Sequence, residues 1–221
     1  MRKKRGSEER ASVKERLLYA GLRTFAQKGY AGLTIRALCN ECDSNLAAIK
    51  YYFGDKHGFY CAVHNLAREL MQRQTDAMLD SHAGDDPWTL MREHINLLLS
   101  HSYDNIMFQA AWLHIREALD TTTSELISRS EEDEEHRNRF QERLRNLFAL
   151  LLGPEAATEK NLLLLEHTYF SMTLFLVIHT RIAEQHEDTM LHNIKKNVGL
   201  DELADYILDS LKNSVRMMQG G

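Results

Sequence analysis

A group of polar and basic residues between positions 34 and 57 has the types and spacing needed to bind a nucleic-acid groove. Short or polar side chains such as Asn45 and Lys50 can reach base edges and phosphates. Lys56 comes at the expected start of a helix, where free backbone N–H groups and a lysine both attract phosphate. The candidate nucleic-acid contacts are Thr34, Arg36, Asn45, Ala48, Lys50, Tyr51, Tyr52 and Lys56.

Two short helical patterns must position these residues. The first has a small inward face made by Ile35, Leu38, Cys39 and Cys42. The second repeats at i, i+3 and i+7, which predicts that Leu46, Ile49 and Phe53 point inward. A tight polar turn joins the two patterns, so residues 34–57 are predicted to form a helix-turn-helix.

Capping residues mark the ends of these helices. Thr34 and Asn45 are natural N-caps for the two helices. Asp43 and Ser44 supply the turn, in which aspartate tolerates a left-handed backbone. Gly54 closes the second helix, and Asp55 caps the next one.

With the preceding segment included, this stretch resembles the TetR family of bacterial transcriptional regulators. The segment VKERLLYAGLRTFAQKGY (Val13 to Tyr30) is similar to the first helix of that family, and TIRAL and YYFGDK are similar to its later motifs. NLAAIKYYFGDK is closest to the CecR (YbiH) type. Two positions depart from the pattern, since Asp43 replaces a usual glycine and Tyr52 a common histidine. The resemblance implies a DNA-binding head at residues 1–57 that binds a double-stranded operator, and a helical regulatory and dimerisation domain at 58–221.

The distribution of charge agrees with this division. Residues 1–60 carry 12 Lys and Arg against 6 Asp and Glu, whereas the rest of the chain has a net charge of −11. A basic head on an acidic body is typical of a small DNA-binding module attached to a domain that does not bind DNA. The sequence MRKKR at residues 1–5 extends the basic character into an arm that we expect to be disordered.

The body is predicted to be entirely helical. Only 2 prolines and 11 glycines interrupt long i, i+3, i+4 patterns in the 221 residues, and no alternating strand pattern is evident. The expected body helices span residues 57–81, 88–102, 105–119, 124–152, 155–184 and 200–218. No targeting segment and no membrane-length apolar run is found, so a cytoplasmic protein without a membrane partner is expected.

The segment LLLLEHTYFSMTLFLVI (Leu162 to Ile178) is apolar nearly all round its helix. Such a helix must be covered on every side. A symmetric partner that packs the last two helices into a four-helix bundle would cover it, as the resemblance also implies, so a homodimer is expected. The alternative is a helix that lies at the centre of a monomer core.

The body also carries aromatic and polar residues that could bind a small molecule. Apolar walls with a few converging polar groups describe a ligand pocket. The candidate ligand-binding residues are Phe108, Trp112, Arg116, His167 and Phe170. The same residues also fit an ordinary core whose polar atoms are hydrogen-bonded.

The sequence gives little support for redox chemistry, metal binding or catalysis. Cys39 and Cys42 form a C-x-x-C pair, but small buried side chains explain them better than redox chemistry does. The 11 histidines form no convincing ligand cluster, and no phosphate loop or nucleophile elbow occurs. No enzyme activity, cofactor or metal is therefore expected. The favoured function is a ligand-responsive repressor, and the alternatives are a DNA-bound scaffold for another protein or a metal or redox sensor.

Overall fold

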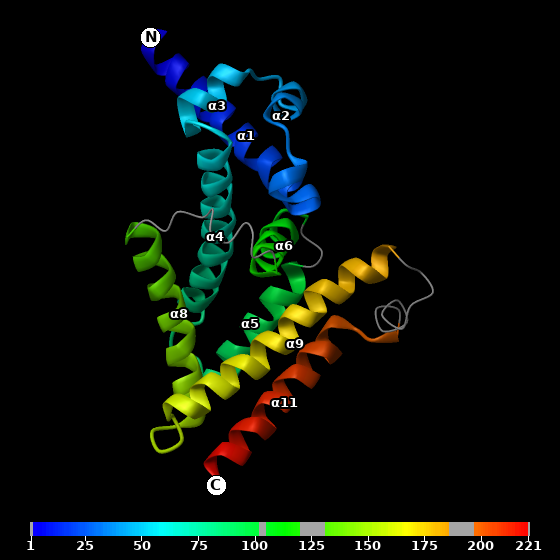
Figure 1. Cartoon of the computed structure of the whole chain (residues 1–221). Coiled ribbons are helices and arrows are strands. Elements are labelled where there is room, and N and C mark those ends of the chain that lie inside the picture. Colours follow the sequence, from blue (N-terminus) through cyan, green and yellow to red (C-terminus); the bar gives the residue numbers. More distant parts are fainter. Residues whose placement is uncertain (1, 102–104, 120–130, 186–196, 221) are drawn as a thin grey trace. The chain divides into compact units, whose positions relative to one another are not determined.

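All regular secondary structure in the described part of the chain is α-helical, which confirms the predicted fold class (Figure 1). The computed structural model describes residues 2–101, 105–119, 131–185 and 197–220. Its helices are α1 (Arg2–Gly32), α2 (Ile35–Glu41), α3 (Leu46–Phe53), α4 (Lys56–Ser81), α5 (Pro87–His101), α6 (Asn105–Leu119), α8 (Glu131–Leu152), α9 (Glu159–Gln185) and α11 (Leu200–Gln219).

Most predicted helix ends are found where the capping residues placed them. Pro87 is the first residue of α5, and the Asp86 carboxylate accepts a hydrogen bond from the Trp88 N–H at 2.9 Å. Helix α8 ends before Gly153, whose φ of 75° suits a residue without a Cβ. The predicted start of the 124–152 helix at residues 124–130 lies outside the described residues.

Two predicted boundaries were wrong. The expected disordered arm is helical from Arg2 onward, because no proline interrupts the pattern and a helix gains one hydrogen bond with each added residue. Helix α9 begins at Glu159 and not at Glu155, because the Thr158 hydroxyl accepts a hydrogen bond from the Asn161 N–H at 3.3 Å and so caps the helix there.

The chain divides into two compact units. The first contains Met1–Met71 and Ile106–Ser130, and the second contains Gln72–Asn105 and Glu131–Gly221. Helix α4 therefore contributes its first part to one unit and its last part to the other.

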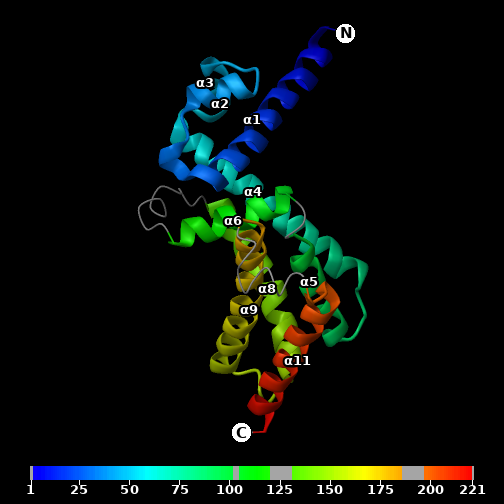
Figure 2. The ribbon, with the colours of Figure 1, turned by 90° about the vertical axis from the view of Figure 1, so that its right-hand side faces the viewer.

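In the first unit, α2 packs against α1, and α3 packs against α2 (Figures 1 and 2). Their shared core is built around Phe25, whose ring centroid lies 4.8 Å from that of Tyr60 and 5.7 Å from that of Phe59. Helix α6 contributes Ala110 and Leu113 to the same core. This buried aromatic cluster provides a rigid support for the helix-turn-helix.

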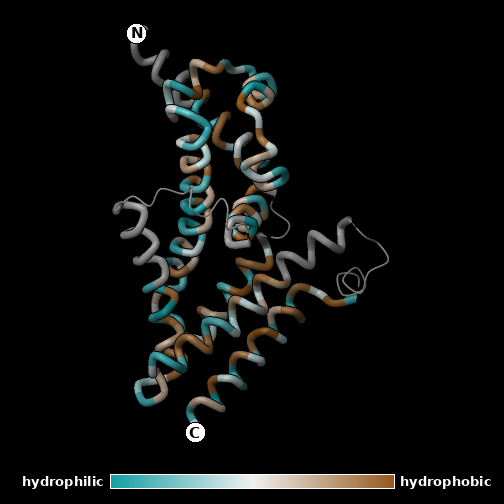
Figure 3. Tube along the Cα trace, viewed as in Figure 1, coloured by the Kyte–Doolittle hydropathy of each residue, from teal (hydrophilic) through white to brown (hydrophobic). Residues whose placement is uncertain are grey.

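In the second unit, α5, α8, α9 and α11 pack against one another. Helix α11 is strongly amphipathic, with hydrophobic residues recurring among hydrophilic ones along its tube (Figure 3). It buries one face, formed by Ala204, Ile207, Leu208, Leu211 and Val215. The core also holds a polar pair, because the hydroxyl of Tyr169 lies 2.6 Å from Nδ1 of buried His94.

In helix α9, the described side chains up to Phe175 bury one side of the helix. Its buried side chains include Leu162, Leu165, Tyr169 and Thr173. Large apolar side chains on its other sides are exposed, namely Leu163, Leu164, Phe170, Leu174 and Phe175. The prediction that this segment is apolar nearly all round is confirmed for its described part, and the single chain leaves much of that surface open.

Candidate nucleic-acid interface

The helix-turn-helix is held together by the predicted caps. The hydroxyl of Thr34 accepts a hydrogen bond from the Ala37 N–H at 3.4 Å and caps α2. The side-chain oxygen of Asn45 accepts one from the Ala48 N–H at 3.0 Å and caps α3. Both N-cap predictions are confirmed, and each bond satisfies a backbone donor that the helix itself leaves unpaired.

The turn between α2 and α3 depends on Asp43. Its φ of 47° makes it the one non-glycine residue with a left-handed backbone in the described part of the chain. The Ser44 N–H donates to the Cys39 carbonyl oxygen at 2.9 Å and closes the turn. Aspartate tolerates this conformation better than most residues because its short polar side chain bonds locally, so it can replace glycine here.

Most predicted nucleic-acid contacts lie on the outside of this motif. Thr34, Arg36, Asn45 and Lys50 are exposed, and Tyr51 is 72% exposed. A tyrosine this open has left most of its apolar surface in water, which is costly unless a partner covers it.

Two predicted contacts on α3, Ala48 and Tyr52, are partly buried and do not lie on the open outer face. The side chain of Ala48 is partly buried and packs against the core of its unit. Tyr52 is partly buried, and its ring centroid lies 5.0 Å from that of Tyr51 in an edge-to-face contact. Tyr52 therefore helps to hold Tyr51 in place.

The prediction that Leu46 points inward was wrong. Its side chain is 51% exposed, whereas Ile49 is buried and Phe53 is partly buried. Leu46 is the first residue of α3, where the helix leaves the turn before the buried side of the motif closes over it. An exposed leucine here is a further candidate contact, since apolar side chains can bind the methyl group of thymine.

A hollow of about 480 Å³ lies at the junction of α2 and α3. Its lining residues are Arg36, Cys39, Asn40, Ser44, Asn45, Leu46 and Ala47. Three of the lining residues, Asn40, Leu46 and Ala47, are exposed and were not among the predicted nucleic-acid contacts. The α2–α3 junction thus places hydrogen-bonding groups, such as those of Arg36 and Asn40, and the apolar side chain of Leu46 around one concave surface.

Lys56 lies at the start of α4, as expected, but its side chain is engaged within the protein. Its Nζ lies 4.5 Å from the ring centroid of Tyr30, and burial lowers the pKa of the ammonium group. The Asp55 carboxylate caps the same helix by accepting a hydrogen bond from the Gly58 N–H at 2.8 Å. The ring of Tyr30 thus fixes the lysine beside a helix N-terminus.

Three of the candidate ligand residues lie on α6 in the first unit. The rings of Phe108 and Trp112 are stacked with centroids 6.3 Å apart. Arg116 lies against the end of α1, where its Nη1 donates to the Gln27 carbonyl oxygen at 3.4 Å. A Cβ on Gly29, whose φ is 70°, would lie 2.7 Å from Nη2 of Arg116. The Arg116 guanidinium therefore lies near the C-terminal end of α1, where the helix dipole stabilises a positive charge.

The other two candidate ligand residues, His167 and Phe170, lie on α9 in the second unit. Both side chains are exposed, and Phe170 retains 46% of its accessible surface. The five candidates are therefore divided between two compact units, and each unit by itself brings together only its own members.

The C-x-x-C cysteines have the environment of small apolar residues. Cys39 is buried and Cys42 is partly buried, and both are free thiols. Burial raises the pKa of both thiols, which disfavours the reactive thiolate. Among the residues that the structure describes, no group of three or more His, Cys, Asp or Glu is placed to hold a metal ion. No helix in those ranges is long and apolar enough to cross a membrane.

The N-terminal segment matches a known family of sequences. Residues 9–63 match the family model described as bacterial regulatory proteins, tetR family. Over 128 residues the chain is 27% identical to the HTH-type transcriptional repressor AcnR of Corynebacterium glutamicum, in a match that covers 53% of this chain and 65% of that protein. A 49-residue segment is 35% identical to the probable HTH-type transcriptional regulator YttP of Bacillus subtilis, covering 22% of this chain and 24% of that protein. The chain thus spans less than two thirds of either relative.

Solved structures share the fold over nearly the whole chain. A TetR-like transcriptional regulator from Rhodococcus sp. RHA1 superposes with a TM-score of 0.65 at 13% identity, covering 95% of this chain and 97% of that one. A putative fatty acid metabolism regulator of Clostridium perfringens superposes with a TM-score of 0.60 at 14% identity, covering 90% and 97%. At these identities the likeness concerns the fold alone.

Proposed function

We propose that this chain, a TetR-family helix-turn-helix transcription regulator, binds operator DNA as a homodimer and represses transcription until a small molecule releases it. The observation that carries the proposal is the outer face of the capped helix-turn-helix, where Arg36, Asn45, Lys50 and Tyr51 are exposed together. A recognition helix that is fixed at its N-cap and exposes polar side chains is suited to reading base edges in a major groove. The sequence of α3 further leads us to propose the CecR (YbiH) type.

Dimerisation through α9 and α11 would cover the apolar surface that the single chain leaves open. The exposed residues of α9, namely Leu163, Leu164, Phe170, Leu174 and Phe175, form a surface too hydrophobic for a helix facing water. A two-fold partner that presents the same helices would bury this surface on both chains, as in a four-helix bundle.

Release from DNA would follow from a shift between two conformations of the dimer. Two recognition helices can occupy successive major grooves only when they are about 34 Å apart. A small molecule that binds more tightly to a dimer with another spacing would populate that form and lower operator affinity. Helix α4 contributes to both compact units and would carry the change. The candidate ligand-binding residues stay divided between the two units, with Phe108, Trp112 and Arg116 in the first and His167 and Phe170 in the second.

The base-contacting role of Asn45 can be tested apart from its capping role. Its side-chain oxygen is committed to the Ala48 N–H, so its amide nitrogen is the group available to donate to a base. Asn45→Asp keeps an N-cap but replaces that donor with a negatively charged acceptor. We expect Asn45→Asp to weaken operator binding by at least about 100-fold, the effect of losing a base contact worth about 1–3 kcal/mol and adding repulsion from phosphate.

The assay is fluorescence anisotropy with an operator selected from random DNA. Lys56→Ala should weaken binding to all sequences and lower the salt slope by about 1. Lys160→Ala, at an exposed lysine on α9, is the matched control and should change neither quantity. Wild-type operator affinity in Asn45→Asp, with the helix content unchanged by circular dichroism, would contradict the assigned recognition face.

A further inference from the structure

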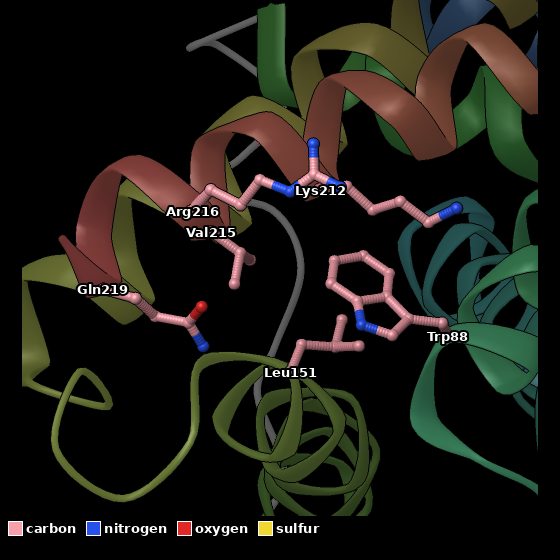
Figure 4. Close-up of a pocket in the computed structure, with 6 residues that line it drawn as sticks. All are labelled: Trp88, Leu151, Lys212, Val215, Arg216 and Gln219. Atoms are coloured by element: carbon pink, nitrogen blue, oxygen red, sulfur yellow. The ribbon is translucent and has the colours of Figure 1, made fainter.

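A second concave site lies entirely within the second compact unit. It is a pocket of about 310 Å³ formed by α5, α8 and α11. Its lining residues are Trp88, Leu151, Lys212, Val215, Arg216 and Gln219. Figure 4 shows these side chains around a central space, with Trp88 on one side and Gln219 on the other. Buried Leu151 and Val215 give the pocket an apolar floor.

The two cations of the pocket differ in how far their charge is offset. Nζ of Lys212 lies 3.6 Å from the Asp209 carboxylate and 5.9 Å from the ring centroid of Trp88. The pKa of the Asp86 carboxyl group is lowered mainly by hydrogen bonds from the Thr89 hydroxyl and the Trp88 N–H, and the positive charge of Lys212 lowers it further. Lys212 is therefore compensated by acidic neighbours.

Arg216 is not compensated in this way. Its Nη1 donates to the Asn213 side-chain oxygen at 3.3 Å, and it makes no ion pair with a carboxylate in the described ranges of the chain. The pocket therefore contains one guanidinium whose charge has no acidic partner among those residues. A guanidinium can bind a carboxylate through two parallel, charge-assisted hydrogen bonds. Such bidentate pairs are among the strongest hydrogen-bonded contacts in proteins.

Two further groups define what else the pocket can bind. The indole N–H of Trp88 has no acceptor among the described residues, so it can donate to a ligand. The amide nitrogen of Gln219 donates to the Leu152 carbonyl oxygen at 2.9 Å, which fixes the side chain and leaves its oxygen as an acceptor. The face of the indole and the apolar floor would cover the hydrophobic part of a ligand.

We infer that this pocket binds a small monocarboxylate with an apolar body. One uncompensated guanidinium matches one negative charge, so a dianion such as a phosphate monoester would bring a second charge without a partner. A volume of about 310 Å³ is at the small end of ligand sites. The inference goes beyond the proposed function, since the site shares no residue with the proposed ligand set and needs no DNA.

The test is direct binding to the full chain in the absence of DNA, measured by isothermal titration calorimetry. The probe is 4-phenylbutyrate, and its matched neutral analogue is 4-phenylbutanol. We expect one carboxylate per chain, bound at least about tenfold more tightly than the alcohol, because the charge-assisted pair is lost with the alcohol. Arg216→Gln should weaken binding of 4-phenylbutyrate by at least about tenfold. Lys160→Gln, which removes an exposed cation elsewhere on the same unit, should leave it unchanged.

A spectroscopic measurement locates the site. In protein labelled with ¹⁵N-tryptophan the two indole N–H resonances are assigned by the loss of one in Trp88→Phe, and 4-phenylbutyrate should shift that resonance. Equal affinities for acid and alcohol, equal affinities for the wild type and Arg216→Gln, or a shift confined to the other indole would each overturn the inference. Tighter binding of 3-phenylpropyl phosphate than of the carboxylate would refute the monoanion specificity. None of these results bears on operator binding, so the two proposals stand or fall separately.

Discussion

Replacing Leu174 with glutamate should separate the proposed dimer while leaving each chain folded. Leu174 lies on α9 with 43% of its surface exposed, within the apolar surface that also includes Phe170. Because the side chain already faces solvent in the single chain, a carboxylate at this position can stay hydrated in the monomer. The same carboxylate would be buried in a symmetric interface, against the apolar side chains of the second copy of α9.

The size of the effect follows from the exposed fraction. Full burial of a leucine contributes about 1.5–3 kcal/mol, so covering the remaining 43% contributes roughly 1 kcal/mol per chain. A two-fold interface contains the residue twice, which gives roughly 2 kcal/mol, or about a 30-fold change in dimer Kd, for loss of the apolar contact. Burial of unpaired carboxylates adds several kcal/mol, so Leu174→Glu should raise the dimer Kd by a factor on the order of 1000 or more.

Sedimentation velocity over a range of concentrations measures this dissociation constant. Leu150→Glu is the matched control, since Leu150 is 64% exposed on α8 and lies outside the apolar surface of α9. It should leave the dimer intact, and both variants should keep the wild-type circular dichroism spectrum. The reasoning is refuted if Leu174→Glu sediments as a dimer at the wild-type Kd, or if the Leu150 control dissociates equally.

Two further predictions concern buried polar groups. Tyr169→Phe removes the hydroxyl that lies 2.6 Å from Nδ1 of His94, so the free energy of unfolding in urea should fall by roughly 1–3 kcal/mol, while Tyr206→Phe, at an exposed site on α11, should have no measurable effect. Burial, followed by the charge of His64, lowers the pKa of His114 to about 3. The unfolded chain takes up this proton near pH 6.5, so the free energy of unfolding should fall as the pH decreases from about 7 toward 3, by an amount on the order of 4–5 kcal/mol. His114→Gln should remove that part of the pH dependence, and an unchanged profile would show that the histidine is not the group responsible.

Local features of the sequence determined the helix-turn-helix and the helical class. N-caps at Thr34 and Asn45 and the left-handed turn at Asp43 all act within three or four residues of chain, so their bonds can be read from spacing. The same holds for Pro87 and Gly153, which mark the ends of body helices. Periodicity likewise indicated that α9 carries more apolar surface than one side can bury.

Features that depend on distant segments were decided only by the tertiary structure. Leu46 follows the periodicity of an inward residue, but it is exposed at the first turn of α3, where it lines the hollow beside α2. Arg116 was grouped with aromatic neighbours as a ligand candidate, yet it contacts the end of α1, 89 residues earlier in the chain. The pocket between Trp88 and Arg216 has no local pattern, because its walls come from three helices whose approach depends on side-chain packing throughout the core. Spacing along a chain records which residues share a helix face, and only the packing of helices determines what that face meets.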